Sequence, residues 1–208
     1  MRIKLVIITS LLFLVSAHGQ KVDSAKLLLD QTTSLLEGGK GVQVDFYTEF
    51  TQGAEEGEME GSIWMMGDQF VIKTEEMKTW FDGLTQWSLI FNMEEVNIIE
   101  PTEQELLDLN PYWILKTYKK GYSIKEGKVD KGLQEVVLTA QKKSMDLQTI
   151  NIWIDLAERI PKIIYLTRKD GSFNTVKIKG IKQNIPLDKN FFKFNPNAYP
   201  RVEEVDLR

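Results

Sequence analysis

The first patterned segment of the chain has the spacing of an amphipathic helix. Apolar residues recur every three or four positions between residues 23 and 37. Asp23 is placed to cap the start of this helix, and Gly38 and Gly39 to end it. The predicted apolar face consists of Val22, Ala25, Leu28, Leu29, Thr32, Leu35 and Leu36. We therefore expect one side of this helix to pack against another element.

From residue 42 the period of the pattern changes to two, which is typical of β-strands with one face in water. Asp82-Gly83 and Asp170-Gly171 are turn signals between two such segments. Strands are expected over 42–49, 59–66, 69–74, 78–81, 87–91, 96–99, 122–125, 133–141, 147–155, 160–168 and 172–183, with a last short strand at Phe191, Phe192 and Phe194.

Two short helices are predicted in the middle of the chain. Thr102 and Glu105 have the spacing of a capping box, and Asn110-Pro111 is a second start signal, with proline at the first helical position. The two helices are expected over 102–109 and 112–119. Each is too short to be stable alone in water, so both must pack on another surface.

This order of elements predicts a mainly β fold with some α-helix. About ten strands, with helices at the start and in the middle, favour an antiparallel sheet that curves over the helices. A sheet of this size that does not close completely can hold apolar ligands on its concave side. No repeat or linker divides the chain, so residues 20–208 are expected to form a single domain.

Residues 1–19 have the pattern of an export signal. Two basic residues precede an apolar run, and the small residues Ala17 and Gly19 then indicate cleavage before Gln20. The apolar run over 5–15 is shorter than the ~20 residues that a bilayer requires. An N-terminal membrane anchor is the alternative. The sequence thus predicts a signal peptide and a soluble periplasmic product.

Composition removes most catalytic chemistry. The chain contains no cysteine, which excludes disulfides, thiolate metal sites and cysteine nucleophiles. Its one histidine, His18, lies in the predicted signal peptide, so no Ser-His-Asp triad or histidine metal site is expected. With 30 acidic and 26 basic residues, a nucleic-acid partner is disfavoured. We predict no catalytic residue, metal site or cofactor, and a pair of carboxylates is the one catalytic alternative.

Several short motifs, in their order along the chain, resemble those of the LolA-type periplasmic lipoprotein carriers, in a divergent form similar to Bacteroidetes sequences. The residues that carry the resemblance are VDFYTEFTQ at 44–52 (aSF-x-Q), GSIW at 61–64 (G-x-L-W), WFDG at 80–83 with Trp87 (the sDGktlW hairpin), the strands at 150–155 and 163–167, and FKFNP at 192–196 (F-x-F-x-P).

This resemblance implies an incomplete antiparallel β-barrel, or strongly curved sheet, whose open apolar mouth is covered by helices. It also implies a non-enzymatic, monomeric carrier that shields the acyl chains of lipoproteins, or another lipid, on the way to the outer membrane. Its partners would be an inner-membrane donor transporter and an outer-membrane acceptor. Two alternatives remain at this point: an envelope sensor or scaffold that binds a partner protein, and a carboxylate-dependent periplasmic hydrolase.

The lipid site is expected on the concave side of the sheet. Because side chains alternate along a strand, Phe70 shares a face with Ile72, and Trp87 shares a face with Leu89 and Phe91. The methionines that cluster between residues 59 and 93 suit a site that adapts to varied ligands. The predicted lipid-binding residues are Trp64, Met66, Phe70, Ile72, Trp80, Trp87, Leu89, Phe91, Leu106, Trp113 and Ile114.

The chain departs from the family where the helices would be held closed. The family carries a basic residue, usually arginine followed by proline, just after the G-x-L-W strand, and this residue helps to hold the helical lid. Here the corresponding stretch contains Gly67-Asp68 and no arginine. Closure of the lid, residues 102–119, is therefore expected to rest on apolar packing. The packing residues would be Leu106, Leu107, Leu109, Trp113, Ile114 and Leu115.

Overall fold

The computed structural model describes residues 24–37, 40–53 and 55–208. The predicted signal peptide over 1–19, together with Val22, Asp23 and the glycines at 38 and 39, lies outside the described residues. Within the described part, no helix is both long enough and apolar enough to cross a membrane.

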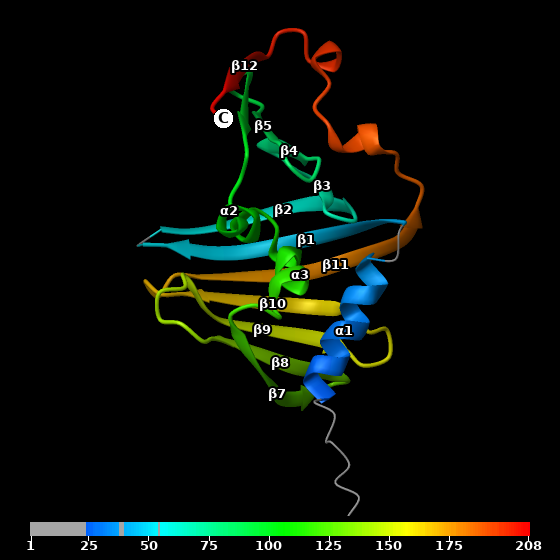
Figure 1. Cartoon of the computed structure of the whole chain (residues 1–208), viewed down its shortest axis with the longest axis vertical. Coiled ribbons are helices and arrows are strands. Elements are labelled where there is room, and N and C mark those ends of the chain that lie inside the picture. Colours follow the sequence, from blue (N-terminus) through cyan, green and yellow to red (C-terminus); the bar gives the residue numbers. More distant parts are fainter. Residues whose placement is uncertain (1–23, 38–39, 54) are drawn as a thin grey trace, which may run out of the picture.

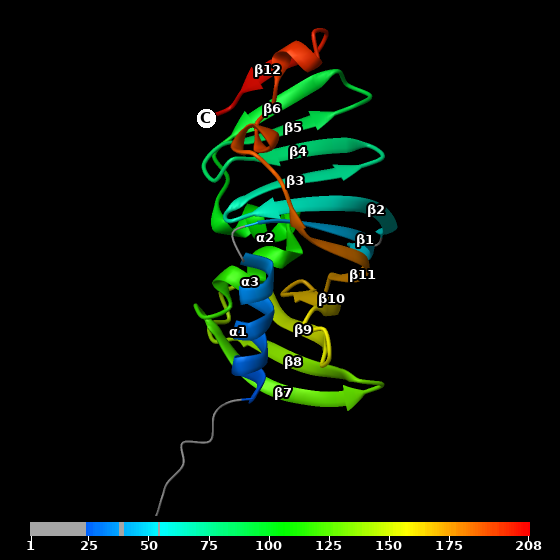
Figure 2. The ribbon, with the colours of Figure 1, turned by 90° about the vertical axis from the view of Figure 1, so that its right-hand side faces the viewer.

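The described strands form one twelve-stranded sheet that curves strongly and does not close (Figures 1 and 2). The strands are β1 (Gly41–Gln52), β2 (Glu55–Met66), β3 (Gln69–Thr74), β4 (Met77–Phe81), β5 (Gln86–Ile90), β6 (Glu95–Ile99), β7 (Tyr122–Asp130), β8 (Leu133–Ala140), β9 (Leu147–Asp155), β10 (Pro161–Arg168), β11 (Phe173–Ile185) and β12 (Glu203–Asp206). Their order across the sheet is β12-β6-β5-β4-β3-β2-β1-β11-β10-β9-β8-β7. Neighbouring strands are antiparallel, except that β12 runs parallel to β6. The predicted mainly β fold, a curved open sheet with helices, is thus confirmed.

Helices cover the concave face of this sheet (Figure 2). They are α1 (Ser24–Glu37), α2 (Glu103–Leu109), the 3₁₀ helix η1 (Pro111–Trp113) and α3 (Ile114–Thr117). The capping box at α2 is present as predicted: the Thr102 hydroxyl accepts from the Glu105 backbone N–H, and the Glu105 carboxylate accepts from the Thr102 backbone N–H. We call residues 102–119, which contain α2, η1 and α3, the lid.

Alternation along the strands separates two apolar cores. On β2, Ile63 and Met65 belong to a large core on the helical face, whereas Trp64 and Met66 pack on the opposite face. The second core is covered by the chain after β11, including Phe192 of the 3₁₀ helix η2 (Lys189–Phe192). This tail continues through η3 (Pro196–Ala198) to β12 (Figure 2).

Several expectations need correction. Strand β7, predicted over 122–125, extends to residue 130, and the helix predicted over 112–119 is divided into η1 and α3. Phe191 and Phe192 lie in η2 and not in a strand, because the Asp188 carboxylate accepts the Asn190 and Phe191 backbone N–H groups and so caps a helical turn. Strand β12 was not predicted, since its four residues are mostly acidic and show no apolar alternation. Strand β2 begins at residue 55 and not 59. Leu35 of α1, predicted to be buried, is 41% exposed.

Candidate functional site

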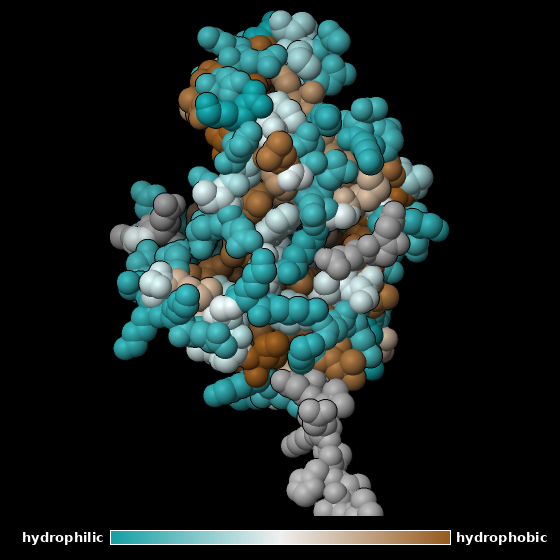
Figure 3. Space-filling view, in the orientation of Figure 1, coloured by the Kyte–Doolittle hydropathy of each residue, from teal (hydrophilic) through white to brown (hydrophobic). Residues whose placement is uncertain are grey.

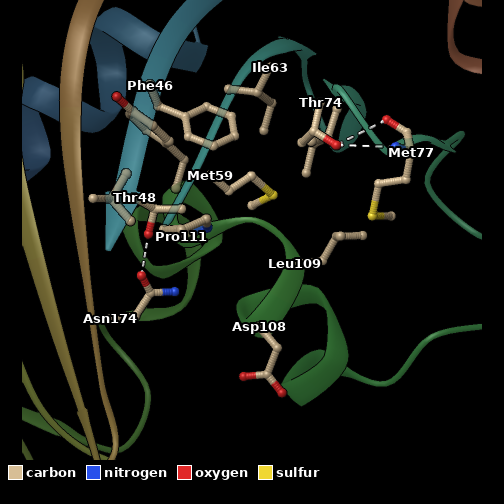
Figure 4. A pocket seen from close by; sticks show the side chains of 13 residues that line it. Phe46, Thr48, Met59, Ile63, Thr74, Met77, Asp108, Leu109, Pro111 and Asn174 are labelled. Carbon is tan, nitrogen blue, oxygen red and sulfur yellow. Dashed lines mark hydrogen bonds between the residues drawn. The ribbon is translucent and has the colours of Figure 1, made fainter. Parts of the chain in front are cut away.

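An apolar cavity lies between the lid and the concave face of the sheet. Its volume is about 110 Å³. The sheet contributes residues from β1, β2, β3, β4 and β11, and the lid contributes the end of α2 and the start of η1. The cavity is lined by Phe46, Thr48, Met59, Ile63, Ile72, Thr74, Met77, Asp108, Leu109, Pro111, Tyr112, Asn174 and Val176 (Figure 4).

The cavity contains few polar groups. The Thr48 hydroxyl donates a hydrogen bond to the Asn174 side-chain oxygen, and the Thr74 hydroxyl accepts from the Met77 backbone N–H at 3.2 Å (Figure 4). The Tyr112 hydroxyl is buried without a hydrogen-bond partner, and burial raises the pKa of this group well above its usual value. The cavity is therefore suited to hydrocarbon rather than to a charged ligand.

The predicted lipid-binding residues lie on both faces of the sheet. Ile72 lines the cavity, and Phe70, Leu106, Trp113 and Ile114 belong to the core around it. Phe91 follows β5 and is 37% exposed. The second core, on the opposite face, contains Trp64, Met66, Trp80, Trp87 and Leu89. The structure thus brings five of the eleven residues together around the cavity, two from the sheet and three from the lid, and a lipid-binding role for any of them remains a prediction.

Sequence reasoning missed most of the cavity wall. Phe46 and Thr48 share the buried face of β1 with Val44, so the alternation already marked them as facing the core. Met59 and Met77 belong to the methionine cluster that the sequence analysis singled out. Asn174 carried no comparable signal, because its position depends on the pairing of β11 with β1.

An ion pair joins the lid to the β2–β3 turn, contrary to the expectation that apolar packing alone holds it. Lys116 of α3 lies 2.7 Å from the Asp68 carboxylate and also donates to the Gly67 carbonyl oxygen. In this chain the turn carries the acidic partner and the lid carries the basic one.

A second ion pair holds the other end of the lid. Arg168 at the end of β10 lies 2.7 Å from the Asp108 carboxylate on α2 and 2.6 Å from Asp146. Burial opposes the charge of this guanidinium, but hydrogen bonds to the two carboxylates outweigh it, so the pKa of Arg168 is raised. In Figure 4 the Asp108 carboxylate points away from the cavity. The charge of Asp108 therefore contributes to the ion pair with Arg168 that holds α2.

Apolar contacts complete the closure of the lid. The Trp113 ring packs edge-on against Phe70 and Phe81, with centroid distances of 6.3 and 5.9 Å. Leu106, Leu107, Ile114 and Leu115 are buried, as the sequence analysis expected. Seen from outside, polar side chains cover most of the helical face, and apolar areas remain visible between them (Figure 3).

The lid is also attached to α1 through Asp30. This carboxylate accepts hydrogen bonds from Lys119 at 2.8 Å, Lys26 at 2.6 Å and the buried Tyr118 hydroxyl at 2.5 Å. The bond from Lys119, followed by those from Lys26 and Tyr118, lowers the pKa of Asp30 far below its usual value. Asp30 therefore stabilises the joint between α1 and α3 in its charged form.

The substitution Asp30→Asn is expected to lower the free energy of unfolding at pH 7 by about 1–2 kcal/mol, because charged hydrogen bonds are lost at a partly exposed site. A carboxyl with a depressed folded-state pKa stabilises the fold above its unfolded pKa of ~3.9, and this contribution is lost as the pH falls through the folded pKa. The difference between variant and wild type should therefore shrink below pH 4 in chemical denaturation. Asp130→Asn, at an exposed position of β7, is the control; a difference that does not change with pH would contradict this role.

The site is thus an apolar cavity beneath a helical lid that ion pairs attach at both ends. Residues 15–171 match the model of the family described as "Outer membrane lipoprotein carrier protein LolA". Because this match covers most of the chain, the protein belongs to that family. No match to the sequence is found among curated proteins.

Solved structures with the same architecture have low sequence identity. An uncharacterized conserved protein from Thermus thermophilus is 13% identical with a TM-score of 0.58, over 88% of this chain and 99% of that one. A DUF1329 family protein from Desulfovibrio piger is 11% identical with a TM-score of 0.50, over 85% and 99%. A LolA superfamily protein from Nitrosomonas europaea is 12% identical with a TM-score of 0.49, over 82% and 97%. At these identities the first two support the fold alone.

Proposed function

We propose that this protein is a periplasmic carrier that encloses an acyl chain of a lipoprotein, or of another lipid, between its lid and its sheet for transfer to the outer membrane. The observation that carries the proposal is the apolar cavity beneath the lid, in a chain of this family. Met59 and Met77 on its wall support a ligand of variable shape, because the unbranched methionine side chain adapts to its neighbours.

The size of the cavity supports a lid that moves. An engineered cavity of about 150 Å³ accommodates one benzene-sized molecule. A volume of about 110 Å³ is therefore too small for a long acyl chain. In this proposal the described conformation is the closed state, and the ligand takes the place of lid side chains on the sheet.

The energetics of acyl transfer support a carrier that depends on other proteins. Burying one methylene gains roughly 0.8 kcal/mol, so a sixteen-carbon chain gains roughly 12 kcal/mol relative to water. A bilayer offers a similar gain. Uptake therefore needs a driven donor at the inner membrane, and release needs an acceptor at the outer membrane that binds the acyl chain more tightly.

The hydrolase alternative finds little support in the cavity. A glycosidase needs two carboxylates that converge on the substrate. Asp108 is the one carboxylate among the described residues of the cavity wall, and it is paired with Arg168. The described wall of this cavity therefore offers no pair of converging carboxylates.

Export to the periplasm is part of the proposal. It rests on the pattern of residues 1–19 and on the family, whose carriers act there. The intact mass of protein from a periplasmic fraction checks it: cleavage before Gln20 is expected, and retention of residues 1–19 in the membrane fraction would contradict it.

Native mass spectrometry of the protein purified from its own periplasm tests the carrier role. We expect a population whose added mass corresponds to a lipid or a lipidated polypeptide, and this population should disappear after delipidation and return on incubation with a diacylated lipopeptide. A lipid-free mass together with a stably bound, unlipidated protein would instead favour the sensor or scaffold alternative and contradict the carrier.

A further inference from the structure

Half of β2 has a free edge. Strand β2 covers Glu55–Met66, but β3 pairs only with its second half, from Gly61 onward. Strand β3 ends at Thr74, because the Thr74 hydroxyl accepts the Met77 backbone N–H and so turns the chain into β4. In the part of the chain that the structure describes, residues 55–60 therefore pair with β1 on one side and with no strand on the other.

A groove of about 480 Å³ runs beside this free edge. We call it the edge groove; its lining residues are Tyr47, Phe50, Glu58, Met59, Glu60, Thr74, Glu75 and Glu76. Met59 and Thr74 also line the apolar cavity beneath the lid. These two side chains therefore form part of the wall of both the edge groove and the cavity.

The charges of the edge groove have one sign. Glu58 and Glu60 come from β2, and Glu75 and Glu76 come from the β3–β4 turn. Glu58 accepts a hydrogen bond from the Tyr47 hydroxyl at 2.6 Å, and Glu60 is paired with Lys179 on β11. None of the described residues that line the groove is basic, and two lysines, Lys177 and Lys179, lie over the Tyr47 ring at its margin, 5.4 and 5.2 Å from the ring centroid. A polypeptide with basic side chains complements this surface.

We propose that the edge groove binds an extended, basic polypeptide segment that adds to the free edge of β2 as an antiparallel strand, while the acyl group attached to that segment occupies the cavity. Strand addition supplies main-chain hydrogen bonds to residues 55–60, and the glutamates select lysine or arginine side chains. The inference rests on the proposed function and deepens it: the cargo is a lipidated polypeptide with a basic tether after its acylated residue, and not a free lipid.

The competing explanation is that the glutamates only protect an exposed edge. Charged residues on edge strands commonly prevent pairing with other chains. The two explanations predict opposite effects of a basic peptide on residues 55–60. In the proposal the peptide pairs with this segment and slows its amide exchange, whereas a protected edge stays unpaired.

The experiment compares five probes below their aggregation concentration. Three are N-palmitoyl octapeptides with lysine, serine or glutamate at alternate positions, and the other two are palmitate and the unacylated lysine peptide. We expect the lysine peptide to bind at least tenfold more tightly than the glutamate peptide. It should also slow amide hydrogen exchange over residues 55–60 and leave residues 61–66, already paired with β3, unchanged.

The triple variant Glu58→Gln, Glu75→Gln, Glu76→Gln should bind the lysine peptide at least fivefold more weakly and bind palmitate as the wild type does. The matched control is Glu203→Gln, Glu204→Gln, which removes exposed charges from β12 at the far edge of the sheet and should change neither affinity.

The outcomes separate this inference from the proposed function. Equal binding of the three peptides and of palmitate, with no change in exchange over 55–60, would overturn the inference and leave the carrier role standing. If no acylated probe binds, the carrier role fails. In that case, slower amide exchange over residues 55–60 with the unacylated lysine peptide would still support strand addition at this edge. Unchanged exchange over these residues would contradict both the carrier role and strand addition.

Discussion

A covalent link between positions 68 and 116 is expected to slow uptake of an acyl chain at least a hundredfold. Asp68 on the β2–β3 turn and Lys116 on the lid are joined by an ion pair of 2.7 Å, so a short bismaleimide can bridge cysteines at both positions. Because the natural chain has no cysteine, Asp68→Cys and Lys116→Cys supply the only thiols. The link keeps the lid on the sheet, and the closed cavity of about 110 Å³ then cannot admit the chain.

The measurement is the fluorescence increase of an environment-sensitive fatty acid on mixing with the protein. We expect rapid uptake by the unlinked double variant, since the ion pair is gone, and at least a hundredfold slower uptake after linking. The control links Glu49→Cys with Lys177→Cys, a carboxylate–lysine pair of 2.9 Å on neighbouring strands away from the lid. Uptake at the control rate by the protein linked at 68 and 116 would show that the lid need not open.

The secondary structure of this chain was largely predictable because its signals are local. The period-two segments, the turn at Asp82-Gly83 and the capping box at Thr102 each depend on residues a few positions apart, and the structure has the expected strands and helices there. The prediction of secondary structure is wrong in two situations. Either a side-chain cap overrides the local pattern, or the segment has no local pattern. Phe191 and Phe192 look like a strand, but the Asp188 carboxylate caps a helical turn instead.

The candidate site was less predictable because it depends on which face of the sheet the lid covers. Alternation shows that Trp64 and Ile63 point to opposite faces, and it assigns neither face to the cavity. Both faces of β2 to β4 are apolar, since the tail after β11 covers the second one with Phe192 and Phe194. When both faces of a sheet are buried, its strands no longer alternate between apolar and polar residues, so the sequence does not show which face lines the cavity.

The contacts that hold the lid were beyond sequence reasoning for a related cause. Lys116 and Asp68 are 48 residues apart, and Arg168 meets Asp108 only after the sheet has brought β10 beside α2. The chain has 26 basic and 30 acidic residues, and the sequence alone does not show which of them form ion pairs with each other. The family pattern indicated a basic residue near position 67, and the structure places the base on the opposite partner.

The second large effect is expected from Trp113→Ala. The indole of Trp113 fills the space between the lid and the aromatic pair Phe70 and Phe81, and Lys116 lies 5.1 Å from its ring centroid. Removing a half-buried tryptophan should cost about 2–3 kcal/mol of lid packing, somewhat less than for a fully buried ring. The same change removes the ring that Lys116 packs against, and it should therefore also weaken the ion pair between Lys116 and Asp68.

Hydrogen exchange measures this loss at the lid itself. Because α2, η1 and α3 are short, they depend on contacts with the sheet, and 2–3 kcal/mol corresponds to roughly 30- to 150-fold faster exchange by local opening over residues 103–119. The strands beneath should keep their protection, and uptake of an acyl probe should become faster. Trp153→Ala is the matched control, since Trp153 is a half-buried tryptophan on β9 outside both apolar clusters. Equal loss of protection across lid and sheet in Trp113→Ala would make Trp113 an ordinary core residue, and unchanged exchange at 103–119 would mean that these helices do not act as a lid.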